Sequence, residues 1–265
     1  MDAYTIIELG LSSIDIIICG AIVAFTVPKI NADKEDAVPV ALFDFAMISM
    51  MLSEIYWVVF PLMRGDVRMP IAANEMGEIA CFLLMSSAVR LGYRRERISA
   101  RTEIIGAAIF SAAQIVLWIL WTGEWVQDII GGMAFAYMLC VAAWALKQAD
   151  VMSANMWRAL GFSCFAAVAL NGITFLVDEE LENILLAIVN IFMLSWLILF
   201  AINSIASVKN KASAKIQITF AFTTFVWSIS TMYISEGITY EIALTASIFI
   251  KLLIFITLRN EMEES

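Results

Sequence analysis

The sequence predicts an all-α, polytopic integral membrane protein in which nine helices cross the bilayer. Three observations predict this fold: 62% of the 265 residues are hydrophobic, only 15% are charged, and the mean hydropathy is +0.87. A soluble globular protein has about 45–50% apolar and about 25% charged residues. No gap between apolar runs approaches the roughly 50 residues of a small soluble domain. We therefore expect one transmembrane domain spanning residues 1–265.

The nine predicted helices correspond to nine apolar runs. A helix needs about 20 largely apolar residues to cross the hydrocarbon core of a bilayer. The runs cover residues 5–27, 40–63, 71–93, 104–122, 125–147, 157–177, 183–207, 216–235 and 241–259. Prolines support several of these boundaries, because Pro28, Pro39, Pro61 and Pro70 fall near helix ends, where proline disturbs backbone hydrogen bonding least.

The distribution of lysine and arginine predicts how the helices are oriented. With the N-terminus outside, 13 of the 16 basic residues fall at cytoplasmic helix ends, and only Arg64 and Arg68 fall outside. An excess of basic residues in short cytoplasmic loops sets the orientation of membrane proteins. We therefore predict an outside N-terminus, a cytoplasmic C-terminus and a location in the cell membrane, which in a bacterium is the inner membrane.

The residue types argue against several classes of function. Histidine is absent, and the four cysteines all lie within apolar runs without Cys-x-x-Cys spacing. The commonest metal ligand and the usual general base are therefore missing, and a thiolate metal site is not indicated. The sequence also lacks a phosphate-binding loop, a nucleophile with a base partner and a nucleic-acid signature. We predict no metal, no cofactor and no nucleic-acid partner.

Acidic residues within the first three predicted helices are the main candidates for a functional site. A charged side chain at membrane depth costs at least about 2.5–3.5 kcal/mol, so it usually faces a protein interior or a wet cavity. Asp15 falls on a polar stripe of the first helix, and Asp44 and Glu54 lie within about 80° of each other on the second. In the third helix, Glu75 and Glu78 are neighbours on one face.

These carboxyl groups have two interpretations. If they approach one another away from bulk water, they raise one another's pKa and can relay protons or cations. Alternatively, acids near the helix ends, such as Glu8 and Glu75, are ordinary solvated groups, and Glu75 is favourably placed near a helix N-terminus. The candidate ligand- or ion-binding acids are Asp15, Asp44, Glu54 and Glu78.

Polar residues of later helices complete the candidate site. Lys251 lies about ten residues from the outer end of the last span, at nearly the same depth as Asp15. We predict an ion pair between them. A structural role, in which the pair neutralises two buried charges, is favoured over a role in conformational change. The mid-helix amides of Gln114, Asn171 and Asn190 suit hydrogen bonds between helices. We expect Asn171 and Asn190 at the rim of a ligand pocket.

The sequence leaves three functions open. The first is a small secondary transporter, in which the acidic residues couple proton or cation movement to the passage of a small solute. The second is a membrane sensor that signals to a separate cytoplasmic partner through the short tail at residues 260–265. The third is a lipid hydrolase using paired carboxylates, which is least favoured because no nucleophile is visible. The bilayer is a partner in each case, and a homo-oligomer also stays open.

Overall fold

The computed structural model describes mainly the first two thirds of the chain. The described residues are 3–32, 37–64, 73–93, 99–149 and 152–188, with the single positions 191, 248 and 252. Regular secondary structure in these residues is α-helical, which confirms the predicted all-α class for this part of the chain. Its main helices are α1 (Ala3–Ala32), α2 (Ala37–Arg64), α3 (Ala73–Gly92), α4 (Arg101–Thr122), α5 (Trp125–Ala149) and α6 (Ala154–Thr174).

Five of the described helices contain a segment long and apolar enough to cross a membrane. The segments are Leu9–Pro28, Ala37–Phe60, Arg101–Thr122, Trp125–Gln148 and Ala154–Thr174. They match the first, second, fourth, fifth and sixth predicted spans to within a few residues. The third predicted span matches α3, which is more polar because it contains Glu75, Glu78 and Arg90. Most of the last three predicted spans lies outside the described residues, so the count of nine and the orientation stay predictions.

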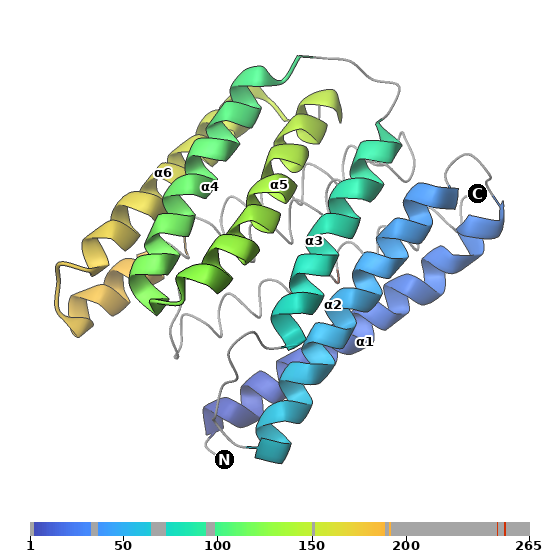
Figure 1. Ribbon diagram of the computed structural model, residues 1–265, viewed down its shortest axis with the longest axis horizontal. Coiled ribbons are helices and arrows are strands. Elements are labelled where there is room, and N and C mark those ends of the chain that lie inside the picture. Colours follow the sequence, from blue (N-terminus) through green and yellow to red (C-terminus); the bar gives the residue numbers. More distant parts are fainter. Residues whose placement is uncertain are drawn as a thin grey trace.

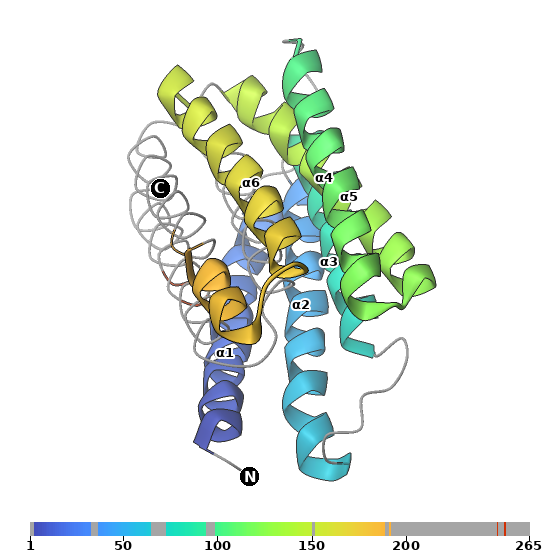
Figure 2. The same cartoon turned by 90° about the vertical axis from the view of Figure 1, so that its left-hand side faces the viewer.

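The six helices form a curved row. Helix α2 packs against α1 and α3, α5 packs against α3 and α4, and α6 packs against α4. Neighbours in space therefore follow the order α1, α2, α3, α5, α4, α6 (Figure 1). In Figure 2 the row is turned by 90°, and α1 and α6 are displaced to the same side of α3 and α5. Because α5 lies between α3 and α4, it joins the α4–α5 hairpin to the first three helices.

An aromatic cluster forms the centre of the core. The fully buried ring of Phe135 in α5 meets Phe82 of α3 and Trp118 of α4, with ring centroids 6.5 and 5.2 Å apart. Both contacts are edge-on, a geometry that adds attraction beyond the burial of apolar surface. Three helices are therefore connected through one side chain.

Two glycines allow neighbouring helices to approach closely. A Cβ atom added to Gly77 of α3 would lie 2.9 Å from the carbonyl oxygen of Ser49 and 3.0 Å from Cβ of Ser53, both in α2. A Cβ added to Gly132 of α5 would collide with Ile115 of α4. Small residues at such points are typical of helix packing in membranes, where van der Waals contact replaces the hydrophobic effect between helices. Gly77 therefore sets the distance between α2 and α3.

Large apolar side chains also point outward from the row. Ile17, Phe45, Ile109 and Phe165 are each more than half exposed, although they belong to four different helices. Contiguous exposed apolar surface is rare on soluble monomers and typical of surfaces that contact lipid or another protein. The outward apolar faces and the apolar segments together are those of a membrane-embedded bundle.

Candidate functional site

One face of α1 carries a buried polar stripe. Ser12, Asp15 and Thr26 are at most 4% exposed, and Cys19 and Ile22 between them are fully buried. The spacings along this series are 3, 4, 3 and 4 residues, so all five side chains lie on one face of the helix. The predicted stripe of the first helix therefore points into the bundle, and it continues as far as Thr26, which the sequence analysis did not include. The same spacing rule would have identified it.

Thr26 connects this stripe to Asp44 of α2. The Thr26 hydroxyl forms a hydrogen bond with Oδ1 of Asp44, and both residues are 4% exposed. The same hydroxyl lies 2.8 Å from the carbonyl oxygen of Ile22. Oδ2 of Asp44 is buried without a hydrogen-bond partner among the described residues. Leaving a buried carboxyl oxygen without a partner costs free energy.

Asp15 and Glu54 lie at nearly the same level of the antiparallel helices α1 and α2. Asp15 comes 11 residues before Thr26, and Glu54 comes 10 residues after Asp44. Counted from the Thr26–Asp44 contact, the two levels therefore differ by about one helical rise, or about 1.5 Å. The two acids are 0% and 7% exposed, respectively. Both carboxyl groups are therefore shielded from the surroundings of the bundle.

Glu78 of α3 is half-buried. It follows Gly77, the residue that packs against Ser49 and Ser53 of α2. The Ser53 hydroxyl donates a hydrogen bond of 2.9 Å to the carbonyl oxygen of Asn74. Asp44 is thus placed in the α1–α2 interface by its contact with Thr26, Asp15 and Glu54 are buried on the same two helices, and Glu78 lies on α3.

The predicted amide residues have varied surroundings. Asn171 is buried in α6, where its Nδ2 donates a hydrogen bond of 2.8 Å to the carbonyl oxygen of Ala167 in the same helix. Gln114 is completely buried in α4, and its side-chain amide has no hydrogen-bond partner within the described ranges. Asn190 and Lys251 lie outside the described residues, so the Asp15–Lys251 ion pair stays a prediction.

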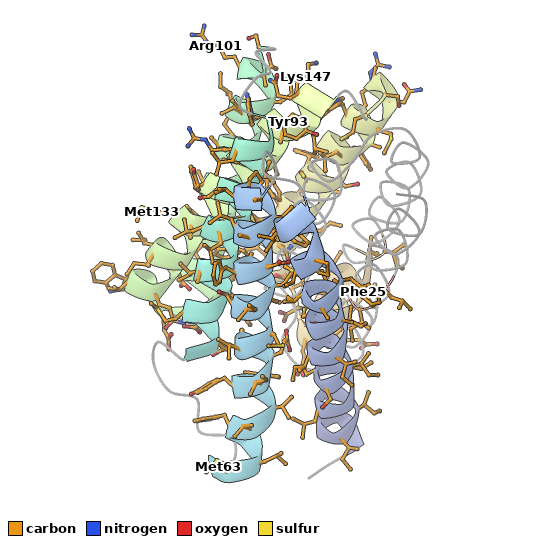
Figure 3. The ribbon with its side chains drawn as sticks, turned by 90° about the vertical axis from the view of Figure 1, so that its right-hand side faces the viewer. Phe25, Met63, Tyr93, Arg101, Met133 and Lys147 are labelled. Carbon is orange, nitrogen blue, oxygen red and sulfur yellow. The ribbon has the colours of Figure 1, made fainter. Side chains whose placement is uncertain are left out.

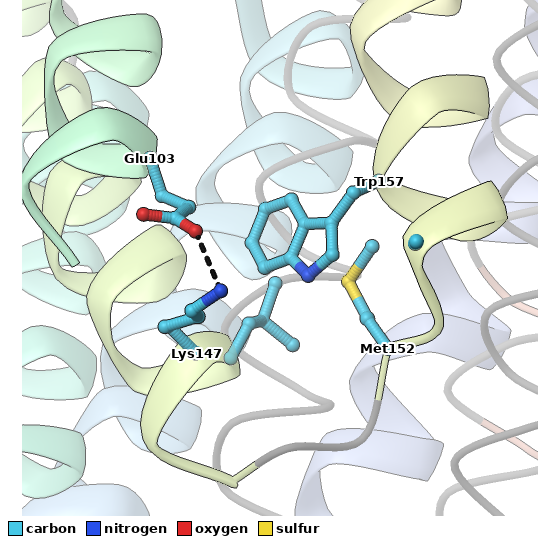
Figure 4. Close-up of a pocket in the computed structure, with 6 residues that line it drawn as sticks. Glu103, Lys147, Met152 and Trp157 are labelled. Carbon is cyan, nitrogen blue, oxygen red and sulfur yellow. Dashed lines mark ion pairs between the residues drawn. The ribbon is translucent and has the colours of Figure 1, made fainter. Parts of the chain in front are cut away.

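A second polar cluster lies at one end of the α4–α5 hairpin. Lys147, in the last turn of α5, forms an ion pair with Glu103, in the first turn of α4, with 2.9 Å between Nζ and Oε1. The pair borders a cavity of about 300 Å³ (Figure 4). The cavity is lined by Glu103, Leu146, Lys147, Met152, Ala154 and Trp157. The sequence analysis missed this site, although an acid starting one helix and a lysine ending the next must meet in an antiparallel hairpin.

The chain matches no family model, no curated protein and no solved structure. Its function is therefore inferred from the chemistry of the two clusters. Within the described residues, no group of three or more acidic or cysteine side chains is arranged to hold a metal ion. The buried carboxyl groups of the α1–α2 interface can exchange protons or bind a monovalent cation. The charged cavity at the end of α4 and α5 can bind a polar ligand.

Proposed function

We propose that the protein is a small secondary transporter, in which Asp15, Asp44 and Glu54 couple proton or cation movement to the passage of a small solute. The observation that carries this proposal is the burial of three carboxyl groups on two neighbouring helices of a membrane protein. Buried acids are costly to keep among transmembrane helices, and ion pathways and proton relays are their usual roles.

Asp44 is the proton-binding group that the contacts favour most. The Thr26 hydroxyl has a single proton, which it can donate either to Asp44 or to the carbonyl oxygen of Ile22. When Asp44 is ionised, it accepts that proton, and the carbonyl of Ile22 keeps only its helical backbone donor. When Asp44 is protonated, it donates to the hydroxyl oxygen and Thr26 donates to Ile22. Proton binding therefore changes the hydrogen bonding of the α1 backbone at this point.

Asp15 and Glu54 form the second proton-binding step of the proposed relay. Both carboxyl groups are buried, and in this mechanism each can carry the transported proton or cation. Ten residues, or about 15 Å of helix, separate Glu54 from Asp44 along α2. Met47 and Met50, which are fully buried, occupy the intervening segment. In this mechanism, the flexible methionine side chains block proton movement between Asp44 and the Asp15 and Glu54 level until the helices move.

Proton flux into liposomes tests the proposal. The purified protein is reconstituted into vesicles that contain a pH-sensitive dye, and amino acids, organic cations and carboxylic acids are added one at a time. We expect at least one solute to produce a change in internal pH. Asp44→Asn and Glu54→Gln should each reduce that change by about tenfold or more, because neither amide can carry the proton.

A matched control separates coupling from general damage. Glu124→Gln removes a carboxyl group from an exposed turn between α4 and α5, and it should leave the flux unchanged. Equal flux in the normal protein and in Asp44→Asn would contradict the proposal. The sensor and the hydrolase have no supporting observation in the described part of the chain. They stay alternatives.

A further inference from the structure

The cavity beside the Glu103–Lys147 pair lies at one end of the helical bundle. Figure 3 places Arg101 and Lys147 at this end, where the apolar segments Arg101–Thr122 and Trp125–Gln148 begin and finish. The opposite ends of the same two helices meet at Gly123, next to the exposed side chains of Trp121 and Trp125. A cavity at the limit of two spanning segments is at the level of lipid headgroups.

The charges that line the cavity balance each other. Glu103 and Lys147 are 18% and 38% exposed in their side chains, so both remain accessible beside the cavity. The ammonium group of Lys147 has three hydrogen-bond donors, and one suffices for the bond to Oε1 of Glu103. An anionic ligand at Lys147 would meet the carboxylate of Glu103 within a few ångströms. A ligand that carries one positive and one negative group matches this pair better.

The rest of the lining is apolar and includes an aromatic ring. Figure 4 shows the indole of Trp157 between the ion pair and the side chain of Met152. Tryptophan is enriched at the interface of membrane and water, and its ring face attracts ammonium groups. The cavity volume of about 300 Å³ is at the lower end of small-molecule pockets, which span roughly 300–1,000 Å³. It therefore has room for a headgroup and not for acyl chains as well.

Beyond the cavity, one side of α6 carries apolar residues. Trp157, Gly161 and Phe165 are spaced by four residues and lie on one side of the helix. Gly161 has nothing within 4 Å of the position where a Cβ would be, and Phe165 is 71% exposed. Open space at a glycine, between two aromatic residues of the same helix side, suits an acyl chain that descends from a headgroup held at Trp157.

We propose that this cavity binds the headgroup of a zwitterionic phospholipid that carries a primary ammonium group. The phosphate contacts Lys147, and the ammonium group lies between the carboxylate of Glu103 and the ring of Trp157. The acyl chains extend along the Trp157–Phe165 side of α6. This site is separate from the acidic α1–α2 interface, so it stands whether or not the protein is a transporter.

Lipid retention measured by native mass spectrometry tests the proposal. The full chain is extracted from nanodiscs that contain equal amounts of phosphatidylethanolamine and phosphatidylglycerol. We expect phosphatidylethanolamine to be retained about three- to tenfold more than phosphatidylglycerol. Glu103→Gln and Lys147→Gln should each abolish that preference. The exposed-residue controls Glu179→Gln and Arg158→Gln should preserve it, because neither residue lines the cavity.

Two further measurements distinguish lipid binding from a purely structural role of the ion pair and from binding of a free headgroup. The double substitution Glu103→Lys, Lys147→Glu reverses both charges and keeps an ion pair. Any thermal stability lost in the single variants should therefore be recovered. The lipid preference should stay lost, because the phosphate and ammonium group of a lipid cannot exchange depths. Soluble phosphoethanolamine should not displace the lipid at equal concentration. Equal retention of the two lipids, an unchanged preference in Glu103→Gln, or efficient displacement by phosphoethanolamine would each overturn the proposal.

Discussion

At the scale of single residues, the contact between Thr26 and Asp44 is central to the α1–α2 interface. It joins a hydroxyl and a carboxyl group that are both shielded from the surroundings. Hydrogen bonds to buried polar groups contribute most through the cost of leaving one partner unsatisfied. Thr26 therefore matters to the stability of the protein as well as to the proton-binding state of Asp44.

Replacing Thr26 with valine tests that contribution. The two side chains have nearly the same shape, but valine cannot hydrogen-bond to Asp44 or to the carbonyl of Ile22. We expect Thr26→Val to lower the free energy of unfolding by about 1–3 kcal/mol, because Oδ1 of Asp44 is left buried without this partner. Thermal unfolding in detergent provides the measurement.

Two companion variants make the interpretation specific. Thr26→Ser keeps the hydroxyl and should lose less stability than Thr26→Val. Thr26→Val combined with Asp44→Leu removes both polar groups, so the loss should be smaller than the two single losses added together. Simple additivity of the two losses would show that the hydrogen bond does not couple the residues.

At the scale of helices, packing depends on where small residues allow backbones to meet. Gly77 lets α3 approach Ser49 and Ser53 of α2. Ser53 of α2 forms a hydrogen bond to α3, and Asp44 of α2 contacts α1. One helix therefore holds the polar residues of two interfaces, on faces that are set by its periodicity.

Gly77→Ala should disrupt the α2–α3 contact. The added methyl group would lie 2.9 Å from a backbone oxygen of Ser49, which cannot move without shifting the helix. We expect a loss of about 1–3 kcal/mol in the free energy of unfolding, as for other overpacked positions. Gly106→Ala in α4 is the matched control, since nothing lies within 4 Å of its Cβ position. It should be neutral or stabilising by up to about 1 kcal/mol, and equal effects of the two substitutions would contradict the close approach at Gly77.

At the scale of the whole molecule, the row of helices decides which parts of the chain become neighbours. The first three helices carry the buried acids, and α4, α5 and α6 enclose the charged cavity. Helix α5 connects the two halves because it packs against both α3 and α4. The two candidate sites are consequently built from different helices, and substitutions in one should leave the other intact.

Reporter fusions test the predicted orientation of the chain. A green fluorescent protein fused after residue 150 should fluoresce, because this point is predicted to be cytoplasmic. Alkaline phosphatase fused after residue 178 should be active, because this point is predicted to be outside the membrane. The basic residues near the cytoplasmic helix ends are the physical reason for that orientation. The reverse pattern of activity would contradict the predicted orientation.

Some features of the site could be anticipated from residue spacing, and others could not. The positions of Asp15, Asp44 and Glu54 on buried helix faces follow from periodicity and from the cost of charge in lipid. The contact of Asp44 with Thr26 depends on how α1 and α2 are aligned along their axes. Trp157 reaches the Glu103–Lys147 pair only because α6 packs against α4, a contact that no residue pattern indicated.

The sequence by itself determined the helical class and the membrane-spanning segments of the described region, because the length and polarity of an apolar run are local properties of the chain. Only the tertiary structure decided that α5 lies between α3 and α4, that Thr26 contacts Asp44, and that a charged cavity forms beside Trp157. These features depend on which helices become neighbours and on how far each is shifted along its axis. Both are set by side-chain packing between distant parts of the chain, and helix periodicity contains no information about either.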